Sequence, residues 1–209
     1  MKVLLINAHP DPDAARSFSN RMLSHLASRL PAEDTDTLTL YQADIPELNG
    51  DLMAMFGKLG SGLALTEAEQ QTSLRLAQIM TQFKAAHRVV ISLPMYNFNV
   101  PSRLKSYIDT IIVPNQTFQY TEQGPRGLMN DGRRLLVLQA SGSTYSRGPL
   151  ASMEISIPYL RMVFQDFLGF DSVDVIRAEG TQEAGADPDG VFRQALADID
   201  ARLPDFLAP

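Results

Sequence analysis

Five short apolar runs alternate along the chain with longer stretches whose apolar residues recur at helical spacing. Most of the runs lack polar alternation, which is typical of strands buried on both faces of a sheet. We expect strands at residues 3–6, 35–41, 87–93, 135–139 and 173–176. A helix should follow each strand, the first beginning near Ser17 or Ser19 and the others covering residues 66–86, 102–112, 157–170 and 191–207.

This alternation predicts a parallel sheet with right-handed crossovers and helices on both of its faces. The chain has no internal repeat, and its 209 residues with 44% hydrophobic content suit one domain over residues 1–209. The expected fold class is therefore α/β, with a doubly wound five-stranded sheet.

Three loops with the character of ligand-binding segments follow the first, third and fourth strands, at residues 9–19, 95–98 and 140–145. In the flavodoxin-like strand order 2-1-3-4-5 these strands are neighbours, and strands one and three flank the point where flavin mononucleotide (FMN) binds in that fold. We therefore expect the three loops to meet at the carboxyl edge of the sheet.

The loops differ in what they offer a ligand. The first has serines at a helix start, which suit an anion through hydroxyls, backbone N–H groups and the helix dipole, although they could equally be simple N-caps. The second combines flat apolar side chains with an amide between two prolines that limit its movement, which suits a planar heteroaromatic ligand. Its residues are Pro94, Met95, Tyr96, Asn97, Phe98 and Pro101.

The remaining segments carry weaker signals. The glycine-rich connection 42–65 should be functional or mobile, with a short helix near 52–58. Residues 116–121 have strand character and lead into a turn-rich flap at 122–127 of the kind that covers pockets. The pair Arg133 and Arg134 should be solvated at the amino end of a strand. The helix over 66–86 should bury one face, made of Leu74, Ala77, Ile79, Met80 and Phe83.

Charge and composition exclude several functions. The 18 basic and 24 acidic residues give a net charge of −6, which disfavours a nucleic acid as partner. With no cysteine and three scattered histidines, neither a disulfide nor a metal site is expected. No apolar run reaches membrane-spanning length, and the first strand begins too early for a signal peptide. We expect a cytoplasmic protein.

Sequence motifs of other enzyme classes are absent. No G-x-G-x-x-G follows the first strand and no P-loop occurs, which disfavours a Rossmann-bound NAD and ATP hydrolysis. The nucleophile elbow G-x-S-x-G is also missing, although Ser141 lies at a strand end where His9 could approach it in space. An esterase built around Ser141 remains a minor alternative.

The chain resembles the FMN-dependent NADH-azoreductase and quinone reductase family of flavodoxin-like proteins over nearly its whole length. Two segments carry the resemblance most specifically. They are Pro94-Met95-Tyr96-Asn97-Phe98, with Pro101 and Leu104-Lys105 after it, and residues 120–128. The segment 140–143 matches more loosely. The resemblance implies a homodimer with flavin sites near its interface, a ping-pong cycle with NADH or NADPH, and reduction of quinones and azo compounds.

The resemblance also assigns site residues. Phosphate and ribityl contacts fall on Ser17, Phe18 and Ser19, and contacts to the flavin ring fall on Pro94, Met95, Tyr96, Asn97 and Phe98. The far side of the ring falls on Ala140, Ser141, Gly142 and Ser143. The family usually has a serine just after strand one, where this chain has His9 at the cofactor site. The expected cofactor is therefore FMN, with FAD as the alternative.

Two tyrosines are candidates for a catalytic role. Reduction places negative charge near N1 and the C2 carbonyl of a flavin, where preorganised donors stabilise it. The N–H groups of Gly142 and Ser143 and the Tyr145 hydroxyl are our candidates for these donors, and Tyr120 with the 122–128 flap is a candidate lid. A flavodoxin-like electron carrier or flavin-binding regulatory subunit without turnover is the alternative function.

Overall fold

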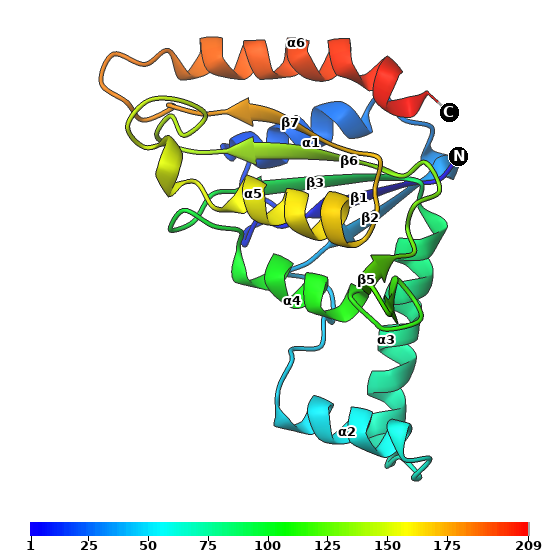
Figure 1. The fold of residues 1–209 in the computed structure, drawn as a ribbon. Coiled ribbons are helices and arrows are strands. Elements are labelled where there is room, and N and C mark those ends of the chain that lie inside the picture. The colour runs from blue at the N-terminus through cyan, green and yellow to red at the C-terminus, as the bar shows by residue number, and fades with distance from the viewer. Residues whose placement is uncertain (209) are drawn as a thin grey trace.

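The computed structural model describes residues 1–208 and contains a five-stranded parallel sheet in the order β2-β1-β3-β6-β7 (Figure 1). Counted along this sheet alone, that is the predicted order 2-1-3-4-5, so the flavodoxin-like fold class is confirmed. The strands are β1 Val3–Asn7, β2 Thr35–Thr39, β3 Arg88–Pro94, β6 Arg134–Ala140 and β7 Ser172–Ala178.

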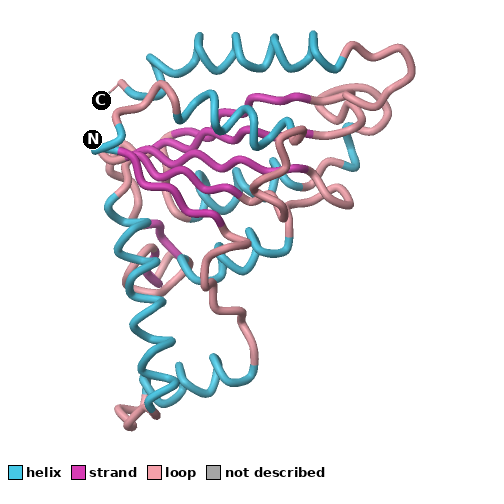
Figure 2. Tube along the Cα trace, turned by 180° about the vertical axis from the view of Figure 1, so that it is seen from behind, coloured by secondary structure: helices cyan, strands magenta, loops and turns pink. Residues whose placement is uncertain are grey.

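Helices cover both faces of the sheet (Figure 2). Val3 and Leu5 of β1 pack toward α1 (Phe18–Ala27) and α6 (Pro188–Leu207). Leu4 and Ile6 point to the other face, where α3 (Glu67–Ala85), α4 (Ser102–Ile111) and α5 (Ser156–Arg161) lie. The alternation of side chains along a strand thus feeds two separate cores, which explains why the strand sequences are apolar throughout.

Helix starts follow their sequence signals. Ser17 caps α1, since its Oγ accepts the N–H of Asn20 at 3.3 Å. Thr66 and Glu69 form the predicted capping box of α3, with the Thr66 N–H donating to Glu69 Oε2 at 2.7 Å. The α-helix predicted over residues 157–170 is shorter than expected: α5 ends at Arg161 and continues as a π-helix over Met162–Phe167. In this wider turn Phe164 packs against Phe83 and Phe170, while Phe167 packs outward against Phe118.

The connection 42–65 and the start of α3 extend away from the sheet (Figure 1). Here α2 (Gly50–Gly60) packs beside the first half of α3, and we call residues 48–76 the arm. The prediction that Leu74 and Ala77 are buried is wrong: both are exposed, Leu74 by 58%. The cause is that the first half of α3 passes beyond the sheet, so only Ile79, Met80 and Phe83 reach the core.

The strand-like segment and flap form a separate hairpin of β4 (Phe118–Thr121) and β5 (Gly124–Gly127). The Phe118 ring of this hairpin packs on the Phe167 ring with a centroid distance of 4.9 Å. A Cβ on Gly127 would lie 2.3 Å from the carbonyl carbon of Leu168, so this close approach requires glycine. The hairpin lies toward the amino ends of the strands in both views (Figures 1 and 2).

Buried arginines close that amino edge. Arg133 is 4% exposed and donates to the Lys84 carbonyl at 2.8 Å and to Asp131 at 2.7 Å, so the prediction of a solvated pair is wrong for Arg133. The carbonyls at the end of α3 have no helical partners, and the guanidinium supplies them. Arg88 similarly donates to the Gly132 carbonyl at 2.8 Å and to the Phe206 carbonyl at the end of α6. Within residues 1–208 no helix has the length and apolarity to cross a membrane.

Candidate active site

Hydrogen bonds join the three predicted loops at the carboxyl edge of the sheet. The Ala8 N–H donates to the Ser92 carbonyl at 2.9 Å, and the Met95 N–H donates to the Ala140 carbonyl at 2.9 Å. The Ser141 N–H continues the series to the Ala178 carbonyl at 3.0 Å. The expected convergence of loops 9–19, 95–98 and 140–145 is therefore confirmed.

Two buried asparagines that the sequence reasoning missed support the first loop. The Asn7 amide donates to Asn20 Oδ1 at 3.2 Å, and the Asn20 amide donates to the Asp11 carbonyl at 3.0 Å and the Pro12 carbonyl at 3.1 Å. Asn20 is the third residue of α1, so these bonds hold the loop against the start of the helix. An amide inside an otherwise apolar helix face was the available signal.

The start of α1 offers donors to an anion. The N–H groups of Phe18 and Ser19 open the helix and have no partner within residues 1–208, while the Ser17 and Ser19 hydroxyl oxygens lie 3.0 Å apart. The Ser92 hydroxyl holds the Ser19 carbonyl at 2.7 Å and fixes the turn. Free N–H groups at the positive end of a helix dipole favour a phosphate.

His9 lies in the first loop, and its hydrogen bonds define the tautomer of its neutral ring. Its Nδ1 accepts the Asp11 N–H at 3.0 Å, and its own N–H donates to Asn7 Oδ1 at 2.9 Å. The neutral ring therefore carries its proton on Nε2, which is the donor that His9 can offer to a ligand.

The second loop is a tight turn under strain. Tyr96 and Asn99 exchange backbone hydrogen bonds of 3.2 and 3.0 Å, and the two residues between them, Asn97 and Phe98, have φ angles of 48° and 69°. A phenylalanine in the left-handed region is rare and strained, and such residues gather at functional sites. The turn leaves Tyr96 44% and Phe98 37% exposed. Burial, with a smaller effect of Tyr41, raises the pKa of Tyr96 and keeps its hydroxyl protonated.

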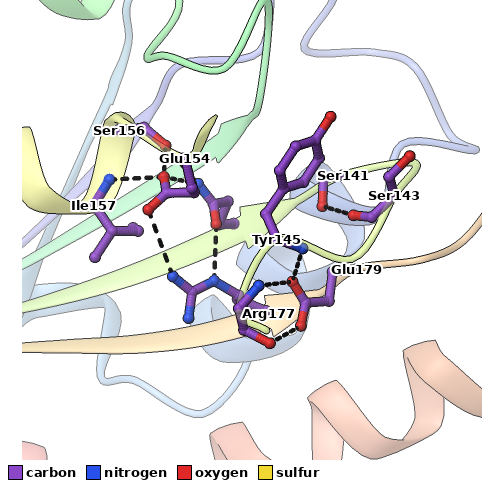
Figure 3. A network of polar contacts seen from close by, with 10 residues as sticks. Ser141, Ser143, Tyr145, Glu154, Ser156, Ile157, Arg177 and Glu179 are labelled. Atoms are coloured by element: carbon purple, nitrogen blue, oxygen red, sulfur yellow. Dashed lines mark hydrogen bonds and ion pairs between the residues drawn. The ribbon is translucent and has the colours of Figure 1, made fainter. Parts of the chain in front are cut away.

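The third loop is fastened from the far side by the segment after β7. The Ser141 hydroxyl donates to the Ser143 carbonyl at 2.8 Å, and the Tyr145 N–H donates to the Glu179 carboxylate at 2.9 Å (Figure 3). The Tyr145 ring meets the Phe98 ring edge to face, with centroids 6.1 Å apart. The second and third loops thus present aromatic surface side by side.

A buried polar network supports these loops from below. Gln139, near the end of β6, donates to the Ser156 hydroxyl at 2.7 Å and accepts from Arg177 at 3.0 Å. Glu154 accepts the Ile157 N–H at 2.9 Å and so fixes the start of α5 (Figure 3). The sequence reasoning missed this network, although a glutamine closing an apolar strand and a glutamate three residues before a helical N–H were signals.

Tyr120 is not brought to the site. It lies on β4 of the hairpin, is 76% exposed and packs on Phe118, toward the opposite ends of the strands. Within one chain the hairpin lies away from the three loops, and the role of Tyr120 and the 122–128 flap as a lid stays a prediction. Local sequence could not show this, because the hairpin follows α4, which runs back to the amino edge before the hairpin begins.

The esterase alternative finds no support in the geometry. The Ser141 hydroxyl donates to a backbone carbonyl, and no histidine of residues 1–208 accepts from it. A serine nucleophile needs a base within hydrogen-bond reach.

A doubly wound sheet with three ligand-facing loops at its switch point defines the class of flavodoxin-like proteins. Comparison with known proteins agrees: the model of the flavodoxin-like fold family matches residues 1–203, and the chain belongs to this family. The resemblance drawn from the motifs is confirmed.

Named relatives and solved structures are similar over nearly the full length. The chain is 40% identical over 211 residues to FMN-dependent NADH:quinone oxidoreductase 1 of Lactiplantibacillus plantarum, with 98% of each chain covered. It is 38% identical over 205 residues to the Bacillus cereus protein of the same name, with 95% of each covered. An FMN-dependent NADH-azoreductase from Bacillus anthracis, solved in complex with FMN, superposes with a TM-score of 0.92 at 36% identity and 99% coverage of both chains.

Proposed function

We propose that this protein is an FMN-dependent NADH:quinone oxidoreductase that also reduces azo compounds. The convergence of the three loops at the switch point carries the proposal, and the printed names of the similar proteins agree with it. When bound, FMN would supply the hydride chemistry between the nicotinamide donor and the quinone or azo acceptor. We expect the protein in the cytoplasm, where the NADH pool lies.

The residues present fit FMN. The free N–H groups of Phe18 and Ser19, with the hydroxyls of Ser17 and Ser19, would hold the phosphate, and His9 would donate from Nε2 nearby. The turn of Pro94, Met95, Tyr96, Asn97 and Phe98 would pack along the ring with its exposed apolar surface. FMN is the cofactor in the names of the similar proteins, and an FAD-bound form is the outcome that the experiment below must exclude.

The segment from Ala140 to Ser143 would supply donors at the other side of the ring. Gly142 and Ser143 have backbone N–H groups without partners in the described part of the chain, and Tyr145 adds a hydroxyl. A Cβ on Gly142 would come within 2.9 Å of Gln182 Oε1, so glycine at this position allows the segment to lie close to the loop after β7. Fixed donors at a place where negative charge develops speed the reaction that creates it.

The arm supports a homodimer. Six large apolar side chains there are 40–62% exposed, and a cavity of about 650 Å³ between α2, α3 and α4 has mainly apolar walls. Apolar surface of this extent on one chain marks an interface. The six residues are Leu48, Met53, Phe56, Leu59, Leu63 and Leu74. In such a homodimer, Tyr120 would act as a lid on the partner's site.

Purification and turnover test the proposal. The isolated protein should be yellow and release FMN, identified by mass, and should oxidise NADH steadily with benzoquinone as acceptor. At about 0.3 kcal/mol per non-hydrogen atom, a cofactor with roughly thirty such atoms is retained without a covalent bond. A colourless protein that refuses added flavin contradicts the proposal. Flavin binding without NADH oxidation would identify an electron carrier instead. Comparing the oxidation rates of NADH and NADPH identifies the preferred electron donor.

A further inference from the structure

The backbone N–H groups of the third loop are divided between the protein and the site. Of the six groups from Ser141 to Ser146, four have partners: Ser141 bonds to Ala178, and the last three bond to carboxylates. Only Gly142 and Ser143 lack a partner in the part of the chain that the structure describes. The loop therefore keeps two consecutive donors free while its other N–H groups are satisfied.

Two of the four partnered N–H groups depend on Glu179, the first residue after β7. One oxygen of its carboxylate accepts the N–H groups of Tyr145 and Ser146 at 2.9 and 3.0 Å, and the other accepts the Ser146 hydroxyl. Glu183 adds one bond, from the Thr144 N–H at 2.6 Å. Hydrogen bonds to a charged group are the stronger kind, so Glu179 is the main attachment of Tyr145 and Ser146. The start of the loop is held separately, since the Gln182 N–H donates to the Gly142 carbonyl at 2.8 Å and Thr181 Oγ1 donates to the Ser141 carbonyl at 3.1 Å.

The attachment also reaches the aromatic surface of the site. The same N–H that Glu179 holds belongs to Tyr145, whose ring meets the Phe98 ring. Phe98 lies in the strained turn, and its carbonyl accepts the Ile155 N–H at 2.9 Å before α5. A shift of the 144–146 backbone would therefore move both the free donors and the tyrosine.

We propose that Glu179 is a positioning residue for the flavin: by binding the N–H groups of Tyr145 and Ser146, its carboxylate aims the free N–H groups of Gly142 and Ser143 at the reduced ring. The proposal rests on the flavin site proposed above. Because the donors stabilise charge that develops only on reduction, Glu179 should affect the reduced flavin more than the oxidised one.

Two substitutions separate position from charge. Glu179→Ala removes all three contacts. Glu179→Gln can keep them, because its Oε1 can accept both N–H groups and its Nε2 can donate to the Ser146 oxygen, while the negative charge is lost. Glu33→Ala is the control, since this exposed glutamate has no side-chain hydrogen bond among residues 1–208.

The first measurement is amide hydrogen exchange at Tyr145 and Ser146 in the flavin-free protein. Glu179→Ala should speed exchange there about tenfold or more, while Glu179→Gln and Glu33→Ala stay near wild type. Unchanged exchange in Glu179→Ala would overturn the proposal, because the carboxylate would then not hold the loop.

The second measurement is the dissociation constant of FMN in its oxidised and reduced forms, with the reduction potential. In Glu179→Ala the reduced form should bind about tenfold more weakly relative to the oxidised form, which is about 30 mV more negative for a two-electron couple. Faster exchange with an unchanged potential would make Glu179 a structural residue only. Glu179→Gln as impaired as Glu179→Ala would assign the effect to charge rather than position. If the wild-type protein binds no flavin, the proposed function and this role both fail, while the exchange result still reports on the attachment of the loop.

Discussion

The carboxyl edge of the sheet and the arm differ in how their residues are held in place. At the edge, the three loops are crossed by short hydrogen bonds such as the Met95–Ala140 pair at 2.9 Å, and buried asparagines hold the first of them. The arm has a well-formed capping box but leaves Met53, Phe56 and Leu59 exposed by 40–57%. We call the edge the complete region, because its loops are held together within a single chain, whereas the arm leaves apolar side chains exposed.

This difference between the two regions predicts that flavin binding and catalytic turnover have different structural requirements. The groups that would hold FMN belong to the complete region, so a single chain should bind the cofactor. In the proposed homodimer, Tyr120 would reach the partner's site and the apolar side chains of the arm would be buried. Three variants test this division and a fourth probes the packed body for comparison, in order of decreasing expected effect.

The largest effect should come from replacing Phe56 and Leu59 together by serine. Burying each side chain in an interface contributes about 2 kcal/mol and a homodimer would lose four of them, so the dimer should weaken by about 8 kcal/mol, roughly a million-fold, and become a monomer at micromolar concentration. Light scattering coupled to size-exclusion chromatography checks this. The monomer should still bind FMN but turn over quinone poorly. A double variant that remains dimeric would show that the arm is not the interface.

At the complete edge, Tyr145→Phe should slow reduction of the flavin by NADH about 100-fold, the usual effect of losing one donor to developing negative charge. Stopped-flow absorbance at the flavin band measures the rate. Tyr159→Phe is the matched control, since Tyr159 lies on α5 outside the three loops, where burial and Asp109 raise its pKa to about 12. An unchanged rate in Tyr145→Phe would remove that hydroxyl from the mechanism.

A substitution in the hairpin should have a smaller effect, and it tests the connection between the site and the proposed dimer. Tyr120→Ala should raise the KM of the acceptor about tenfold, the value of one aromatic contact, and leave the affinity for FMN unchanged. Steady-state kinetics with benzoquinone and a flavin titration give both numbers. Weaker flavin binding with a normal KM would contradict the role of Tyr120 as a lid.

The smallest effect concerns the packed body rather than either surface. The Tyr107 hydroxyl is buried in α4 and has no hydrogen-bond partner among the described residues. Burial raises its pKa and favours the neutral hydroxyl. Tyr107→Phe removes an unpaired polar group and should raise the free energy of unfolding by about 1 kcal/mol, measured by urea denaturation. A decrease would show that the hydroxyl has a partner.

The sheet and its ligand edge were predictable because their signals are local. Apolar runs such as 135–139 identify strands buried on both faces, and loops that follow parallel strands must share one edge. The place of Tyr120 was not predictable in this way, since it depends on the length and direction of α4. Leu74 shows the same limit: its helical spacing is regular, yet no sheet lies beneath it.

The supports of the site were hidden for a related reason. Glu179 follows a strand in a segment that reads only as a loop, and its role comes from Tyr145 and Ser146, more than thirty positions earlier in the chain. Asn20 and Glu154 likewise act on backbone groups of other segments. Side chains that bind distant backbone atoms leave no periodic pattern in the sequence.

The left-handed backbone of Phe98 places stability and function in conflict at one position. Holding a bulky side chain at a φ of 69° costs roughly 1 kcal/mol or more, which glycine would recover. Selection for heat resistance alone should therefore favour Phe98→Gly, and selection for redox work should restore the ring. A laboratory evolution experiment run under alternating pressures would be expected to cycle through this residue.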